Sequence, residues 1–133
     1  MIKLFIGGKG SGKTKTLIEM VNNAVEASKG NVICIEKGDK LIHDITYKAR
    51  LIDTDAYSVN DADALYGFIA GILASNSDIT DIFVDSALKI VDNNTVTFEA
   101  MLKKLEKITA DVNLVMTASI AVDECPAGIK AYA

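Results

Sequence analysis

The sequence predicts an α/β fold, a three-layer α/β/α sandwich around a mostly parallel sheet of about five strands. Short apolar runs alternate along the chain with longer segments whose apolar residues recur at helical spacing. The short runs are continuously apolar, as strands buried on both faces of a parallel sheet require. The chain has one proline and no linker-like stretch, so we expect residues 1–133 to form a single domain.

The first predicted elements are a strand at 2–6, a helix over 14–30 and a strand at 31–36. The helix is predicted to end at Gly30, because glycine accepts the backbone conformation that commonly terminates a helix. Apolar residues mark one face of this helix, and they are Leu17, Ile18, Val21 and Val25.

The next segment, 39–49, also has apolar residues at helical spacing. It predicts a helix that Asp39 caps, since aspartate is among the preferred capping residues. The apolar residues of this segment are Leu41, Ile42 and Ile45. A short strand is predicted to follow at 49–53.

The second half of the chain continues the alternation of helices and strands. Helices are predicted over 60–76 and 95–111, and strands at 81–86 and 113–119, whereas the tail at 122–133 has no clear period. The predicted core-facing residues are Leu65, Phe68, Ile69, Ile72 and Leu73 in the first helix and Phe98, Met101, Leu102, Leu105 and Ile108 in the second.

The stretch GGKGSGKT lies between the first strand and the first helix. Gly7 followed after four residues by Gly12, Lys13 and Thr14 matches the pattern G-x-x-x-x-G-K-[ST], the Walker A motif or P-loop. Such a loop directs backbone N–H groups at phosphate oxygens, beside the positive end of a helix. The alternative is a glycine-rich turn that binds no ligand. The predicted nucleotide-binding residues are Gly7, Gly8, Lys9, Gly10, Ser11, Gly12, Lys13, Thr14 and Lys15.

Two oxygen donors are predicted to hold a magnesium ion. The Thr14 hydroxyl is placed to bind Mg²⁺ while Lys13 contacts the β- and γ-phosphates, which makes Lys13 a candidate catalytic residue. Asp85 ends the run DIFVD and is predicted to be the second metal ligand and a catalytic residue, because ligands bind at the carboxyl ends of parallel strands. Its alternative role is to cap the following turn. Asp81 begins the same strand and belongs to the opposite edge.

A third candidate catalytic residue, Glu36, ends the second predicted strand at the same edge. It is placed to polarise an attacking water molecule, and its alternative is a solvated residue that opens a turn. Thr117 and Ser119 end the last strand, and their hydroxyls are candidates for sensing the γ-phosphate.

These residues together resemble the RecA-like branch of the P-loop NTPases. The likeness consists of the P-loop, Glu36 after the next strand, and Asp85 followed by Ser86 in FVDSALKIV, and it covers most of residues 1–119. It implies the P-loop NTPase fold, a catalytic role for Glu36 and a Walker B role for Asp85. The chain is short for a RecA-like motor core, and MTAS stands where RecA itself has an amide-bearing sensor. The likeness therefore does not imply a recombinase or a helicase.

Composition narrows the classes of partner and compartment. The formal net charge of −4 argues against nucleic acid as a partner, because phosphate backbones require a surplus of Lys and Arg. Cys34 and Cys125 are predicted to be free thiols in a reducing cytoplasm. The longest apolar stretch, 64–74, is too short to span a bilayer, so no membrane partner is expected.

Single residues separate several remaining functions. Arg50 is the one arginine, whereas small-molecule kinases usually draw on several. It is interpreted as a cation at a helix C-terminus, and the RecA-like resemblance allows a role as an arginine finger in a neighbouring subunit. The stretch EKGD differs from the guanine-reading N-K-x-D in its first residue and in its position. His43 is interpreted as a helix-surface residue, because no second histidine is present to complete a zinc site.

The sequence therefore predicts a cytoplasmic P-loop protein that binds Mg²⁺ and ATP and hydrolyses ATP slowly. A protein partner or a second copy of the chain is expected to complete its active site. The alternatives are a nucleotide-dependent switch without enzymatic activity and, third, a small-molecule kinase.

Overall fold

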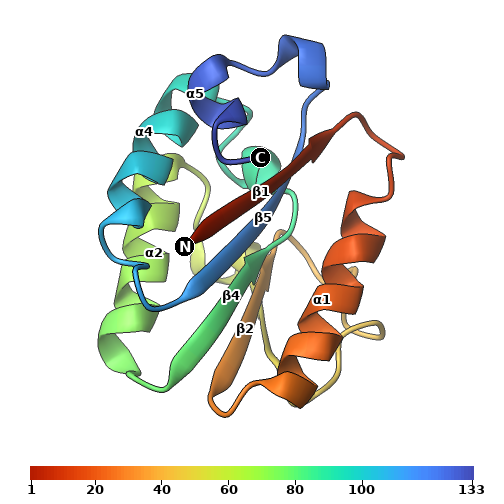
Figure 1. Ribbon diagram of the computed structural model, residues 1–133, viewed down its shortest axis with the longest axis vertical. Coiled ribbons are helices and arrows are strands. Elements are labelled where there is room, and N and C mark those ends of the chain that lie inside the picture. The colour runs from red at the N-terminus through yellow and green to blue at the C-terminus, as the bar shows by residue number, and fades with distance from the viewer.

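The computed structural model describes all residues, 1–133, and contains one five-stranded sheet (Figure 1). The strands are β1 (Ile2–Gly7), β2 (Asn31–Glu36), β3 (Arg50–Asp53), β4 (Ile79–Val84) and β5 (Asn113–Ser119). The helices are α1 (Lys13–Ala27), α2 (Ala62–Ser75), α3 (Ala87–Ile90), α4 (Thr95–Glu106) and α5 (Ala127–Lys130), with short 3-10 helices at Thr54–Tyr57 and Val122–Glu124.

All neighbouring strands of the sheet are parallel, which confirms the predicted α/β class and parallel sheet. The strand order is β1-β5-β4-β2-β3, so β1 and β3 form the two edges. The free edge of β1 is partly covered by the C-terminal segment, because the backbone N–H of Leu4 donates to the carbonyl of Tyr132 at 2.9 Å. Since every strand runs in the same direction, all five carboxyl ends meet at one edge of the sheet.

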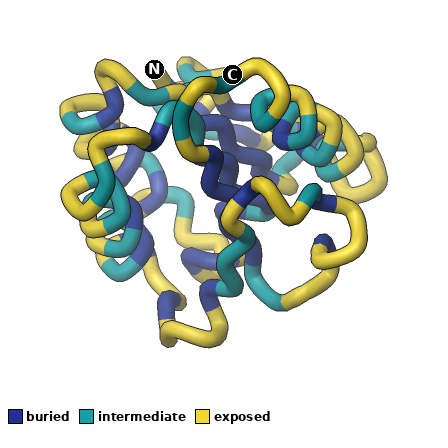
Figure 2. Tube along the Cα trace, turned by 90° about the horizontal axis from the view of Figure 1, so that it is seen from below, coloured by how far each residue is buried: buried dark blue, intermediate teal, exposed yellow.

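The sheet has a hydrophobic core on each face. The larger core contains 23 buried residues and joins the sheet to α2, α3, α4 and α5, whereas the smaller core contains 9 and joins it to α1 and the segment 37–49. Figure 1 shows α1 on one side of the sheet and α2 and α4 on the other. In Figure 2 the buried strands lie at the centre and exposed loops surround them. This arrangement is consistent with a three-layer sandwich.

The predicted helix at 39–49 is wrong, because the segment 37–49 is a series of turns. The side chain of Asn22 bonds to backbone groups that a helix would use for its own hydrogen bonds. Its Oδ1 accepts from the backbone N–H of Thr46, and its Nδ2 donates to the backbone carbonyl of Asp44, both at 3.0 Å. Leu41 and Ile45 are nevertheless buried as the spacing suggested, and one turn suffices for this because the N–H of Ile45 bonds to the carbonyl of Leu41.

The first predicted helix ends earlier than the sequence indicated. The α1 helix stops at Ala27, and Gly30 lies beyond it without a left-handed backbone. Close packing explains the glycine at position 30 instead, because a Cβ atom there would lie 2.1 Å from the carbonyl oxygen of Asp78. The short helices α3 and α5 carry no periodic signal of their own, since each spans only four residues.

Both cysteines are free, as predicted, and both are buried. Burial raises the pKa of the Cys34 thiol to about 12, and the nearby carboxylates of Glu36 and Asp85 add to the rise. No helix in the structure combines the length and the apolar character needed to cross a bilayer.

Candidate functional site

Polar side chains stand in a row along the edge where the parallel strands end. Asp53 and Glu36 are the last residues of β3 and β2, Asp85 directly follows β4, and Thr117 lies two residues before the end of β5. The residue two positions before each of these four packs in or against the smaller core. Because strand side chains alternate between faces, all four side chains belong to the face that α1 covers.

The glycine-rich loop at residues 8–12 connects β1 to α1 beside this row. Gly10 and Gly12 have φ angles of 81° and 85°, a left-handed backbone that other residues rarely adopt. Gly12 precedes the first residue of α1, and no side chain caps the helix. The backbone N–H groups of Lys13, Thr14 and Lys15 therefore have no acceptor within the protein, as expected for the first turn of an uncapped helix. These donors and the helix dipole favour an anion at this end of α1.

The Lys13 side chain folds back over the loop. Its ammonium group donates to the carbonyl of Gly8 at 2.9 Å and to the hydroxyl of Ser11 at 3.1 Å. Both acceptors are neutral, and hydrogen bonds to anionic oxygens are stronger than those to neutral ones. A phosphate chain in the loop would therefore draw the ammonium group away from these contacts.

The structure brings the two predicted metal ligands together. The Thr14 hydroxyl donates to the Asp85 carboxylate, with Oγ1 at 3.1 Å from Oδ1 and 3.4 Å from Oδ2. Asp85 is 8% exposed, and its own backbone N–H donates to the carbonyl of Ile35 at 2.9 Å. The sequence separates Thr14 and Asp85 by 71 positions, so their contact supports the prediction that they act at one site.

Thr117 orients Asp85 rather than facing the open loop. Its hydroxyl donates to Asp85 Oδ1 at 2.8 Å and accepts from the backbone N–H of Ser86 at 2.7 Å. Thr117 is 1% exposed. Ser86 adopts a left-handed backbone with φ of 54°, which belongs to the turn that directs its N–H at Thr117. Ser119 is exposed instead and lies opposite Gly7 in the β1/β5 register.

Glu36 is almost completely buried, at 2% exposure. Its carboxylate oxygens accept the backbone N–H groups of Lys40 and Leu41, both at 3.1 Å. Burial raises the pKa of Glu36 above its ordinary value of 4.5; the two N–H groups oppose this shift, and the charges of Asp85 and Asp53 add to it. Glu36 is therefore not the solvated residue of the alternative interpretation. It fixes the start of the segment 37–49.

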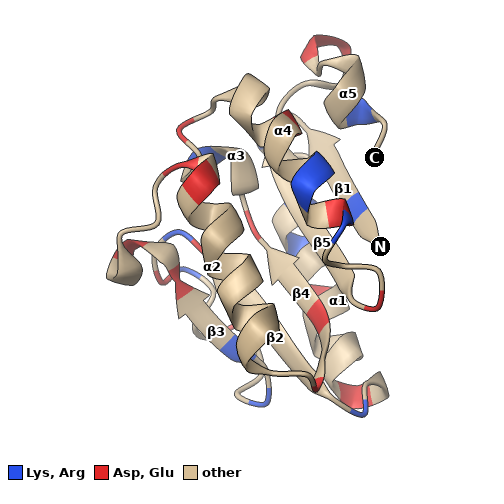
Figure 3. Cartoon of the chain, turned by 90° about the vertical axis from the view of Figure 1, so that its left-hand side faces the viewer, with Lys and Arg blue, Asp and Glu red and all other residues tan.

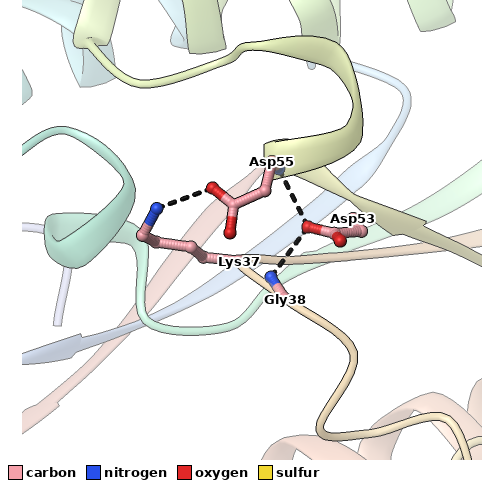
Figure 4. A network of polar contacts seen from close by, with 4 residues as sticks. All are labelled: Lys37, Gly38, Asp53 and Asp55. Atoms are coloured by element: carbon pink, nitrogen blue, oxygen red, sulfur yellow. Dashed lines mark hydrogen bonds and ion pairs between the residues drawn. The ribbon is translucent and has the colours of Figure 1, made fainter.

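Asp53 completes the row and is engaged by the same segment (Figure 4). Its Oδ1 accepts the N–H of Gly38 at 2.7 Å and the N–H of Asp55 at 2.8 Å. Lys37 forms an ion pair with Asp55, with the two charged atoms 2.6 Å apart. These contacts hold the two sides of the β2–β3 connection together, and they direct Lys37 to Asp55.

A cleft of about 710 Å³ opens above the glycine-rich loop between β1 and α1. Its lining includes five lysines, which are Lys9, Lys13, Lys15, Lys40 and Lys89. No Asp or Glu lines the cleft, and none of the five lysines forms an ion pair. Figure 3 shows that acidic and basic residues both occur along the rest of the chain. Such an accumulation of positive charge in a concave site attracts anions.

Sequence reasoning missed Lys40 and Lys89. Lys40 belongs to the segment 37–49 and Lys89 to α3, and neither carries a motif. The signal that could have found them is their position shortly after Glu36 and Asp85, the two residues assigned to the ligand-binding edge. A residue shortly after such a strand end has a high chance of facing the ligand.

Three residues discussed from the sequence lie away from the cleft. Arg50 begins β3 and is exposed at the opposite end of that strand from Asp53, and no helix precedes it. His43 is exposed on a turn rather than on a helix. Asp81 lies near the start of β4, beside Asn113, as its place in the sequence predicted.

The residues present suit Mg²⁺ bound together with phosphate. The structure contains no group of three or more His, Cys, Asp or Glu side chains that could hold a metal by themselves. Mg²⁺ usually binds through one or two protein oxygens and completes its octahedron with phosphate oxygens and water. The adjacent oxygens of Thr14 and Asp85 match that pattern.

Comparisons of the chain with models of known protein families and with curated protein sequences give no match. Function is therefore inferred from the loop, the cleft and the residues at the sheet edge.

Proposed function

We propose that this protein binds ATP with Mg²⁺ and hydrolyses it slowly, as a P-loop NTPase with the RecA-like features of its sequence. The observation that carries the proposal is the coincidence of three features at one place. The Walker A sequence lies on a loop between a strand and a helix, its helix amides lack acceptors, and Thr14 of the motif contacts Asp85. A glycine-rich turn without a ligand would not require the last two features.

The phosphate chain would lie along the loop. The free N–H groups at the start of α1 and the Lys13 ammonium would bind its β- and γ-phosphates. Thr14 and Asp85 would hold Mg²⁺, and Thr117 would keep Asp85 in place through the hydrogen bond that it already donates. When bound, the ion neutralises charge on the phosphate oxygens as it develops during transfer.

Hydrolysis would require a water molecule near the γ-phosphate. The water oxygen would form a bond to the γ-phosphorus as the bond from that phosphorus to the β–γ bridging oxygen breaks, which releases ADP and phosphate. Glu36 is the candidate acceptor for the water proton, because its raised pKa brings it closer to the operating pH of a general base. Each carboxylate oxygen retains a lone pair beyond the one used by the segment 37–49.

Hydrolysis is expected to be slow because no arginine lines the cleft. Arginine placed against the γ-phosphate accelerates related reactions by about 10³–10⁵-fold. Arg50 is exposed at the other end of β3, so it can serve only a neighbouring copy. The proposal therefore includes a protein partner or a second copy that completes the site.

Phosphate release measured over a range of protein concentrations tests this function, with Lys13→Ala as the inactive control and Lys107→Ala as a matched lysine variant. Lys107 is exposed at the C-terminal end of α4, away from the cleft. We expect Mg²⁺-dependent turnover that Lys13→Ala abolishes and Lys107→Ala preserves. A rise in specific activity with protein concentration would support completion by a second copy. Turnover that survives Lys13→Ala would contradict the proposal.

The engagement of Glu36 favours a second candidate, a nucleotide-dependent switch without turnover. Both of its oxygens already accept backbone N–H groups, which suits a structural carboxylate as well as a base. Glu36→Gln separates the two functions. An ATPase would lose turnover while retaining ATP binding, whereas a switch would bind ATP and show no turnover before or after the substitution.

A further inference from the structure

We propose that the cleft recognises the triphosphate chain itself, so that it accepts nucleoside triphosphates with little regard to the base and also binds inorganic tripolyphosphate. This inference rests on the proposed function, because it names the ligand class of the same site. It arises from what lines the cleft and from what the lining lacks.

The lining contains the groups that bind phosphate. Lys9, Lys13 and Lys15 come from the P-loop and α1, and Lys40 and Lys89 face them from the segment 37–49 and from α3. Five ammonium groups without carboxylate partners repel one another in the free protein. An extended polyanion can contact all five ammonium groups and so reduce their mutual repulsion, whereas a single phosphate would contact only some of them.

The lining lacks the groups that bind a base. Nucleobases are usually held between apolar or aromatic walls, with a few directed hydrogen bonds. Only one hydrophobic residue, Leu88, lines the cleft, and at 3% exposure it belongs to the larger core. The four tyrosines and four phenylalanines all lie outside the lining. A base would therefore extend beyond the cleft into solvent.

The remaining polar side chains of the lining can bind groups that all nucleoside triphosphates share. Ser86, Asn93 and Ser119 supply hydroxyl and amide groups at the wall. These groups suit phosphate oxygens and the ribose hydroxyls, which all ribonucleoside triphosphates share. The cleft thus selects for the common part of these ligands.

Calorimetric binding of Mg²⁺ complexes of ATP, GTP, CTP, UTP and inorganic tripolyphosphate to the full chain tests the inference. We expect all five dissociation constants to lie within tenfold of one another. A preference of more than tenfold for one nucleotide, or binding of ATP without comparable binding of tripolyphosphate, would overturn the inference and leave the proposed function standing. Failure of every compound to bind would overturn both.

Variants of Lys89 and Lys40 provide a second test, because neither residue belongs to the Walker A motif. Lys89→Ala and Lys40→Ala should weaken ATP and tripolyphosphate by the same factor, since both ligands present the same phosphates. Lys107→Ala should leave all five dissociation constants unchanged. A variant that weakened ATP and spared tripolyphosphate would place its lysine against the nucleoside and contradict the inference.

Discussion

The hydrogen bonds of the Thr117 hydroxyl define its role near the end of β5. The sequence predicted a group that senses the γ-phosphate, and that role remains a prediction for the exposed Ser119. The Thr117 hydroxyl donates its one hydrogen bond to Asp85 and accepts a hydrogen bond from the N–H of Ser86. Its position between these groups makes Thr117 a positioning residue for Asp85, the proposed metal ligand.

Thr117→Val should therefore leave the Ser86 N–H and Asp85 Oδ1 each without this partner. We expect a loss of about 1–3 kcal/mol in the free energy of unfolding, the usual cost of leaving buried polar groups unpaired. Thr117→Ser keeps the hydroxyl and should recover most of the affinity for Mg²⁺ and ATP that Thr117→Val loses. Urea unfolding and calorimetry measure the two effects. Equal Mg²⁺ dependence in wild type and Thr117→Val would contradict the positioning role.

Glu36 should make the stability fall as the pH rises, which is opposite to the effect of a carboxylate whose pKa is lowered by folding. Its pKa is higher in the folded protein than its ordinary value of 4.5, because burial disfavours the charged form. The folded state therefore retains the proton more strongly than the unfolded state. The resulting stabilisation is complete below pH 4.5 and is lost as the pH rises through the folded pKa.

Comparison of Glu36→Gln with wild type isolates this contribution, because the other titrating groups are common to both. Glutamine offers one acceptor oxygen where the carboxylate offers a separate oxygen to each of the N–H groups of Lys40 and Leu41, so the variant carries a constant penalty at every pH. The difference in unfolding free energy should move in favour of Glu36→Gln as the pH rises from about 4 to 7. A difference that moved in favour of wild type over this range would contradict the assigned direction.

At the scale of elements, the segment 37–49 connects the fold to the cleft. Glu36 and Asp53 hold its first residues, Asn22 of α1 holds its middle, and Lys40 projects from it into the cleft lining. A helix at this place would have aligned the same apolar residues but would have needed the backbone groups that these side chains occupy. Apolar spacing alone does not distinguish one turn from a helix.

Asn22→Ala should destabilise this connection. It removes two side-chain hydrogen bonds to the segment, and we expect a loss of about 1–3 kcal/mol in the free energy of unfolding. Asn23→Ala is the matched control, because Asn23 is the next residue of α1, is exposed and forms no side-chain hydrogen bond. Denaturant unfolding of both variants measures the difference. Equal stability of the two variants would show that the Asn22 contacts contribute nothing.

The sequence predicted those elements that have a continuous apolar run, a helical period or a motif. All five strands and the three longer helices lie where continuous apolar runs and helical spacing placed them, with ends shifted by a few residues. The contact of Thr14 with Asp85 also followed, because both belong to the carboxyl edge of a parallel sheet. Lys40 and Lys89 were not predicted, because neither belongs to a motif and their one signal is a position shortly after Glu36 and Asp85.

At the scale of the whole molecule, the charge of the cleft lining is opposite in sign to the net charge of the chain. The chain carries a formal net charge of −4, and the cleft above the loop between β1 and α1 is lined by five lysines and no acidic residue. A concave site of one sign concentrates ions of the opposite sign, and salt weakens this effect within a Debye length of about 10 Å at 0.1 M. The overall charge opposes polyanions such as nucleic acid, while the local field favours a short one.

The affinity for ATP should therefore fall with salt at constant Mg²⁺. Raising NaCl from about 0.05 to 0.5 M shortens the Debye length severalfold, and we expect the dissociation constant to rise by about tenfold. Lys40→Ala should reduce that dependence, because one of the charges is gone, and Lys107→Ala should not. Calorimetry in the two buffers makes the comparison. An affinity that did not change with salt would mean that the lysines do not contact the ligand.

The central claim is that the loop between β1 and α1 binds a triphosphate, and isothermal calorimetry of Mg²⁺-ATP with wild type and Lys13→Ala tests it most directly. Circular dichroism of both proteins establishes that the variant is folded. We predict saturable binding to wild type at one site per chain and a dissociation constant at least about tenfold weaker for Lys13→Ala, since a charge-assisted hydrogen bond contributes about 1.5–3 kcal/mol. No binding to folded wild type, or equal binding to the two proteins, would contradict the claim.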